Sequence, residues 1–250
     1  MSEKSSRSTQ PADRIGKMKI IKNEKLIKRN GRIGQWTSII ALVVLGGGMY
    51  MTFTNPADPQ MFTYTMVALV VGFVLTQVGM YMGNRYGRSP RPDEILDAGL
   101  KGLPGDYAIY HYVTPVSHLL VGSAGIWTLI PYRQRGVVTY TKNRWRVGGG
   151  GFAQAYMSIF GQEGIGRPDL EAESGIEAMK KLLGKSLSEN EIPDVQVVLI
   201  FTNDAAEIQA EGAPLPALKT KQLKEFIRKK AKEKPIGQIQ LAAVKAALPE

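Results

Sequence analysis

His111 and His118 are the only histidines of the chain, and each falls in a run rich in aromatic and β-branched residues. Imidazole is a common metal ligand, but a metal site needs three or four ligands. The chain has no cysteine, and no other ligand groups cluster near the two histidines in the sequence. Packing or hydrogen bonding is therefore favoured over metal binding, and we expect neither a metal nor a cofactor.

A second candidate site is a segment that interleaves basic and aromatic residues. Surfaces that bind single-stranded nucleic acid have this pattern, because cations contact phosphates and rings stack on bases. The edge of a sheet has it too, since basic side chains there discourage aggregation. The edge interpretation is favoured, and any binding of nucleic acid is expected to be weak. The residues that would carry it are Arg133, Arg135, Lys142, Arg144, Trp145 and Arg146.

Other kinds of chemistry are excluded or poorly supported. Without cysteine, the chain has no disulfide, zinc–thiolate site or thiol nucleophile. The glycine-rich segments 148–151 and 161–166 lack the lysine of a phosphate-binding P-loop. Ser117 and Ser123 have no evident His/Asp partnership, so a serine hydrolase is not indicated.

The basic charge is concentrated at the N-terminus. Of the net charge of +10, most comes from residues 1–35, which carry ten Lys/Arg against three Asp/Glu. Residues 36–83 carry a single charge, Asp58. We therefore expect residues 1–35 to form a basic tail beside a membrane, with the polar residues 1–14 disordered.

Two uncharged runs, residues 36–54 and 61–83, are each long enough to cross a bilayer as a helix. The loop NPADPQ between them is short, so residues 36–83 are predicted to form a transmembrane helical hairpin. Basic residues precede the first run and follow the second, while the loop has none, which places both termini in the cytoplasm. The glycines of the two runs would either mediate oligomerisation or pack the hairpin against itself.

Beyond a linker at residues 84–91, the sequence predicts a cytoplasmic α/β domain at 92–235 and a C-terminal helix within 236–250. A helix begins at Asp93 as N-cap and runs to about residue 103. Strands are predicted from β-branched and aromatic runs, and further helices from apolar spacing. The strands are 107–113, 118–122, 125–130, 136–141 and 195–201, and the helices are 171–183, 219–232 and 236–248. This order fits a mixed sheet flanked by helices.

The stretch VSHLLVGSAGIWTLIPYRQRGVVTYTKNRWR, residues 116–146, resembles the nuclease-related domain (NERD) family of the restriction-endonuclease-like PD-(D/E)XK group. The family pattern has an acid and His, an apolar strand, a Gly turn, a strand with Glu-x-Lys, a Gly and a later Trp. VQVVLIFTNDAAEI with the basic helix after it resembles the family's closing strand and helix. The resemblance covers residues 92–232 and implies an αβββαβ core.

The chain departs from the family at the positions that would catalyse. Such nucleases use two acids and a lysine to hold a divalent metal and activate water. Here Ser117, Ile130 and Tyr132 occupy these positions, and only Glu94, on the first helix, matches a family glutamate. The resemblance therefore implies a nuclease fold that has lost its catalytic residues.

We therefore expect a membrane-tethered, non-enzymatic binding or scaffold module at the cytoplasmic face of the cell membrane. Its partners would be the lipid bilayer and a second copy or another membrane protein. One alternative is a divergent metal-dependent nuclease that uses Glu94 with Asp93 or Asp97. Another is a structural subunit of a membrane complex.

Overall fold

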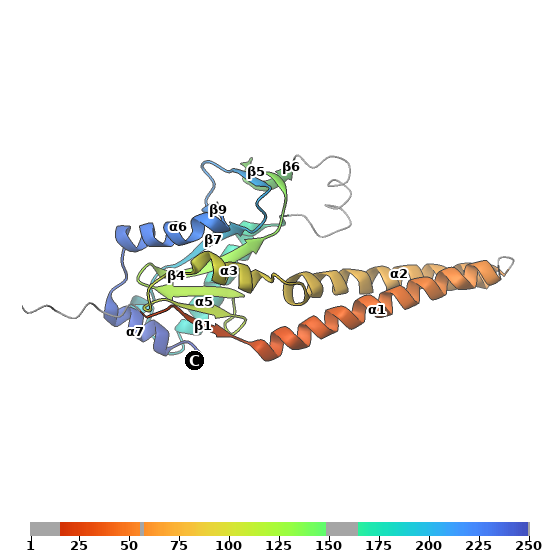
Figure 1. Ribbon diagram of the computed structural model, residues 1–250, viewed down its shortest axis with the longest axis horizontal. Helices are drawn as coiled ribbons and strands as arrows, with labels where there is room; N and C mark the ends of the chain where they lie inside the picture. The colour runs from red at the N-terminus through yellow and green to blue at the C-terminus, as the bar shows by residue number, and fades with distance from the viewer. Residues whose placement is uncertain (1–15, 56–57, 149–164, 250) are drawn as a thin grey trace, which may run out of the picture.

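The computed structural model describes residues 16–55, 58–148 and 165–249 of the 250-residue chain. Two long helices, α1 (Glu24–Thr54) and α2 (Pro59–Met82), project as a hairpin from a domain built on a mixed sheet (Figure 1). The predicted disorder of residues 1–14, and most of the glycine-rich segments 148–151 and 161–166, lie outside the described residues.

Six strands form the main sheet, in the order β1-β2-β3-β4-β7-β9. Its strands β2 to β4 are antiparallel neighbours, and β7 is parallel to β4. The strands are β1 (Lys19–Lys22), β2 (Ala108–His111), β3 (His118–Gly122), β4 (Gly125–Tyr132), β7 (Val195–Phe201) and β9 (Ala217–Lys219). A second sheet has the order β6-β5-β8, from β6 (Arg144–Gly148), β5 (Gly136–Thr141) and β8 (Ala206–Gln209).

Helices cover both faces of the main sheet, which confirms the predicted mixed sheet flanked by helices. On one face, α3 (Pro92–Leu100) and α6 (Thr220–Glu233) pack on residues such as Ile109 and Trp127. On the other, α5 (Pro168–Leu183) and α7 (Gln238–Ala246) pack on residues such as Tyr110 and Ile126. Neighbouring residues thus enter opposite cores, because side chains of a strand alternate between faces.

The expected tail and linker contain regular structure. Lys19–Lys22 pairs with β2 as a parallel edge strand, and α1 begins at Glu24, well before Trp36. Gly83–Gly87 continues α2 as a π-helical turn, η1. Local sequence did not reveal β1, because a four-residue basic segment becomes a strand only through the partner that supplies its hydrogen bonds.

Strand and helix limits differ from the prediction in a few places. β4 extends beyond residue 130 through Pro131, whose missing N–H is tolerated because β3 pairs with β4 only as far as Thr128. The short strands β6, β8 and β9 were not predicted. A short 3-10 turn, η2, covers Glu189–Glu191.

Glycines allow the two helices of the hairpin to approach closely. A Cβ at Gly34 would lie 2.8 Å from Met82 Cβ and 2.9 Å from the backbone nitrogen of Gly83. A Cβ at Gly79 would lie 2.4 Å from Ser38 Oγ, whereas a Cβ at Gly46 would meet nothing within 4 Å among the described residues. Gly34 and Gly79 thus pack the hairpin against itself.

This contrast predicts opposite effects of two identical substitutions on α1. Gly34→Ala should lower the free energy of unfolding by about 1–3 kcal/mol, because the new methyl overpacks the contact with α2. Gly46→Ala should be neutral or stabilising, since alanine favours helix where space allows. Thermal unfolding of the full chain in detergent would measure both. Equal melting temperatures for the two variants would contradict this account of the packing.

Candidate functional site

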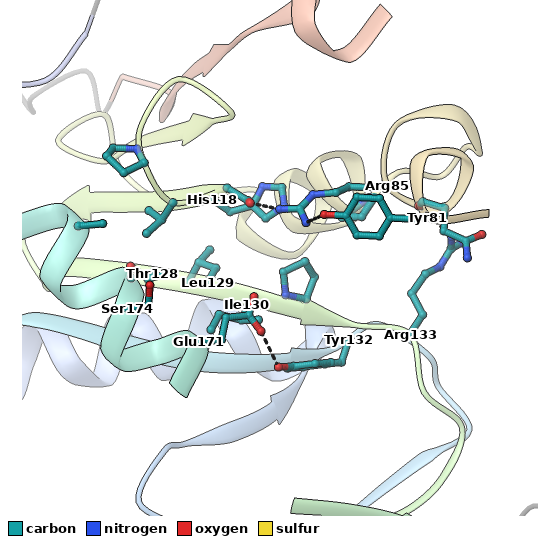
Figure 2. Close-up of a pocket in the computed structure, with 18 of the residues that line it drawn as sticks. Tyr81, Arg85, His118, Thr128, Leu129, Ile130, Tyr132, Arg133, Glu171 and Ser174 are labelled. Atoms are coloured by element: carbon teal, nitrogen blue, oxygen red, sulfur yellow. Dashed lines mark hydrogen bonds between the residues drawn. The ribbon is translucent and has the colours of Figure 1, made fainter. Parts of the chain in front are cut away.

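A pocket of about 480 Å³ lies where the end of the hairpin meets the sheet (Figure 2). Tyr81 from α2 and Arg85 from η1 line one side, and β4 and α5 contribute the other. Ser117, Ile130 and Tyr132, which the sequence resemblance assigns to a nuclease family's catalytic positions, all line this pocket. They meet because β3 and β4 are antiparallel, so Ser117, directly before β3, lies near the second half of β4.

Arg85 supplies positive charge to the pocket. Its guanidinium donates hydrogen bonds to Ser117 Oγ and, at 2.9 Å, to the hydroxyl of Tyr81. Its Cζ also lies 6.0 Å from the centre of the Tyr112 ring. Within the described ranges, no carboxylate forms a salt bridge with Arg85. A half-buried cation therefore faces the pocket with hydroxyl partners in place of a counterion.

Glu171 from α5 brings a carboxylate to the opposite wall. The hydroxyl of Tyr132 donates to Glu171 Oε2 at 3.0 Å, and its ring stacks on Phe201. Burial, reinforced by the charge of Glu171, raises the pKa of Tyr132, so the phenol remains a donor at neutral pH. The carboxylate is thus held by a hydrogen bond from a neutral side chain.

A buried hydroxyl that lines the same pocket is unsatisfied among the described residues. Thr128 on β4 is 4% exposed, and its Oγ1 has no hydrogen-bond partner among the described residues. Ser174 on α5 lines the pocket as well (Figure 2). A buried polar atom without a partner costs free energy unless a ligand or water satisfies it.

The acids of the alternative nuclease hypothesis do not line this pocket. Glu94 accepts hydrogen bonds from the Arg91 backbone N–H at 2.8 Å and from the Ser89 hydroxyl at 3.0 Å, so its carboxylate caps α3. Asp93 is not the N-cap that the sequence predicted, because α3 begins one residue earlier, at Pro92. It is fully buried and forms salt bridges with Lys22 and Arg91.

The two histidines belong to the same buried polar cluster. His111 Nδ1 and His118 Nδ1 are 2.7 Å apart, and His111 Nε2 lies 3.0 Å from Asp97 Oδ1. Burial, together with the nearby His111 and Arg85, lowers the pKa of His118 well below its usual value, so the ring is neutral at physiological pH. Among the described residues, no group of three or more His, Asp and Glu side chains could hold a metal ion.

The basic and aromatic segment is divided between two places. Arg133 lines the pocket, where its Nη1 lies 3.4 Å from the backbone oxygen of Asn84. Arg144 and Arg146 are exposed on β6, an edge strand of the second sheet. Trp145 between them is 5% exposed and donates to Asp169 Oδ1 at 3.1 Å. Arg135 and Lys142 are exposed and do not line the pocket.

Trp145 therefore cannot stack on a nucleic-acid base without leaving the core. Its indole packs against Tyr140, with ring centres 5.3 Å apart. Sequence interleaving suggested one surface, but strand alternation directs Trp145 inward and its two arginine neighbours outward. This arrangement favours the sheet-edge interpretation.

Sequence reasoning missed three of the groups that give the pocket its chemistry. Arg85 was used only to orient the hairpin, while Glu171 and Thr128 were not singled out. These three residues are spread from residue 85 to residue 171, so their positions in the sequence do not indicate that they line one pocket. Comparison of the chain with protein-family models, curated proteins and solved structures finds no match.

The polar cluster behind the pocket predicts a pH-dependent stability. Burial alone would raise the pKa of Asp93, but hydrogen bonds from Arg91 and Lys22 hold it at about 2, below its ordinary 3.8. A lowered pKa means that Asp93 contributes its full stabilisation above pH 4 and loses it as pH falls to about 2. At pH 7, Asp93→Asn should cost about 2 kcal/mol of unfolding free energy.

Thermal unfolding of the full chain in detergent at several pH values measures this effect. The difference in melting temperature between the original chain and Asp93→Asn should be constant from pH 7 to pH 5 and should become smaller below pH 4. Lys221→Gln, which breaks the exposed salt bridge to Asp204, is the control and should change stability little. A difference in melting temperature that does not change with pH would contradict the assignment of the pH-dependent stability to Asp93.

Proposed function

We propose that this chain is a membrane-anchored binding module, built on a NERD-like fold that has lost nuclease catalysis. The order α3-β2-β3-β4-α5-β7, with β5 and β6 inserted between β4 and α5, has an antiparallel meander followed by a helical crossover to a parallel strand, which fits the αβββαβ core of that group. The crossover helix α5 then packs on β4 and β7 and forms one wall of the pocket.

The convergence of Ser117, Ile130 and Tyr132 on one pocket is the observation that supports this proposal most directly. These residues offer a hydroxyl, an alkyl group and a phenol where a metal-dependent nuclease needs carboxylates and a lysine. The pocket survives as a cavity of about 480 Å³, within the usual size range of small-molecule sites. Binding is therefore a better account of it than hydrolysis.

Membrane anchoring is supported by the surface of the hairpin. Both helices are long and apolar enough to cross a bilayer. Large apolar side chains along them are uncovered, among them Leu42, which is 72% exposed, and Phe53, which is 77% exposed. Exposed apolar surface of this extent is stable in hydrocarbon but not in water. The distribution of Lys and Arg then favours cytoplasmic placement of the domain and both termini.

A divergent nuclease remains the second candidate, because Glu171 lies in the pocket. One carboxylate alone replaces little of the water around a divalent ion. We expect the full chain in detergent to cleave neither DNA nor RNA with magnesium or manganese. We also expect neither ion to raise its melting temperature, since only an ion bound to the native state would do so.

The control for this experiment is Glu171→Gln. Metal-dependent cleavage by the original chain that disappears in Glu171→Gln would overturn the non-catalytic proposal. A melting shift with manganese that Glu171→Gln abolishes would also contradict it, even without cleavage.

The orientation is tested by thiol labelling, which is clean because the chain has no natural cysteine. A single cysteine is introduced by Asp58→Cys in the hairpin loop or by Lys229→Cys on α6. In intact cells, an impermeant maleimide should label Asp58→Cys and not Lys229→Cys. Labelling of both after the cells are opened is the control, and the reverse pattern in intact cells would refute the orientation.

A further inference from the structure

We infer that the pocket binds the headgroup of an anionic phospholipid that carries hydroxyls, such as phosphatidylglycerol, taken from the membrane that the hairpin occupies. This inference rests on the proposed membrane-anchored binding function and names its ligand. It joins three observations on the described residues, which are a cation without a carboxylate partner, a buried hydroxyl without a hydrogen-bond partner, and a pocket located at the end of an apolar helix long enough to cross a bilayer.

Two arginines on one side of the pocket favour an anionic ligand. Arg85 has hydroxyl and aromatic neighbours but, in residues 16–55, 58–148 and 165–249, no carboxylate salt bridge. Arg133 is the second cation of the pocket and is exposed. Guanidinium groups bind phosphate oxygens through charge-assisted hydrogen bonds, with a geometry that suits phosphate well.

The opposite wall of the pocket favours a ligand that carries hydroxyl groups. Thr128 Oγ1 is buried, lines the pocket and has no partner among the described residues, and Ser174 lines the pocket as well. Glu171, which already accepts from Tyr132, has further acceptor capacity for a ligand hydroxyl. A phosphate with an attached polyol would satisfy both walls, whereas inorganic phosphate would satisfy only the arginines.

The location of the pocket points to a lipid as the source. Tyr81 belongs to the last turn of α2, and Arg85 follows within the next turn, so the pocket begins where the proposed membrane helix ends. At the same end of the hairpin, the first turns of α1 expose Lys25, Lys28 and Arg32. Basic residues in this position attract anionic lipid from the cytoplasmic leaflet. Figure 1 shows this end of the hairpin directly beside the sheet.

The experiment uses the full chain in nanodiscs of phosphatidylcholine, with or without phosphatidylglycerol, and measures the melting temperature. Phosphatidylglycerol should raise it, because a ligand that binds only the native state stabilises it. Thr128→Val removes the unpartnered hydroxyl, so it should not destabilise the chain in phosphatidylcholine alone. Thr128→Val should nevertheless raise, about tenfold, the phosphatidylglycerol concentration needed for a given rise in melting temperature. Arg133→Gln should have the same effect.

Arg144→Gln is the matched control, since it removes an exposed arginine that does not line this pocket. It should respond to phosphatidylglycerol like the original chain. An equal response of all four proteins would show a general surface-charge effect and overturn the inference. No response of the original chain would also overturn it.

Two further arms distinguish other sources of phosphate. Glycerol 3-phosphate, added to phosphatidylcholine nanodiscs, carries a phosphate and two glycerol hydroxyls without the acyl chains and should stabilise only at far higher concentration. If it matches phosphatidylglycerol, the ligand is a soluble metabolite and the lipid assignment is wrong. Displacement of the lipid effect by a short single-stranded oligonucleotide would assign the pocket to nucleic acid. Failure of any arm leaves the separate cleavage test of the proposed function unaffected.

Discussion

The salt bridges of Lys22 connect the two ends of the hairpin to one another. Lys22 lies on β1, directly before α1, and it binds Asp93 and Asp97 on α3, which follows α2 and η1. The segment that enters the hairpin and the segment that leaves it are thereby attached to the same sheet. Because Asp93 is fully buried, loss of this contact would leave its charge with Arg91 as the one remaining salt-bridge partner among the described residues. The base of the hairpin is thus held against the domain by these salt bridges.

The junction between the hairpin and the sheet forms the pocket. Arg85 can reach Ser117 because η1 continues α2 beyond its last turn and lies against the start of β3. Tyr112 supports the same junction, since its ring lies 5.1 Å from that of Tyr86 and its hydroxyl contacts the backbone oxygen of Arg85 at 3.4 Å. The pocket therefore uses residues of both the hairpin and the sheet.

Three residues connect the proposed nuclease-like fold with the pocket. The spacing of the family pattern assigned Ser117, Ile130 and Tyr132 to its catalytic positions, and the fold places all three around one cavity. Glu94, which matches the family's glutamate on the first helix, does not line the pocket. Glu94 caps α3 and takes no part in the pocket, so its presence carries no evidence for catalysis.

Periodicity and composition determined the hairpin, the mixed sheet and strands such as 118–122, 136–141 and 195–201, because these depend on local patterns of apolar side chains. Strand β1, the inward direction of Trp145 and the meeting of Arg85 with Thr128 and Glu171 were decided only in the tertiary structure. Each depends on contacts between residues far apart in the chain, such as Lys19 opposite Ala108. No local window contains both partners, so only the folded chain specifies them.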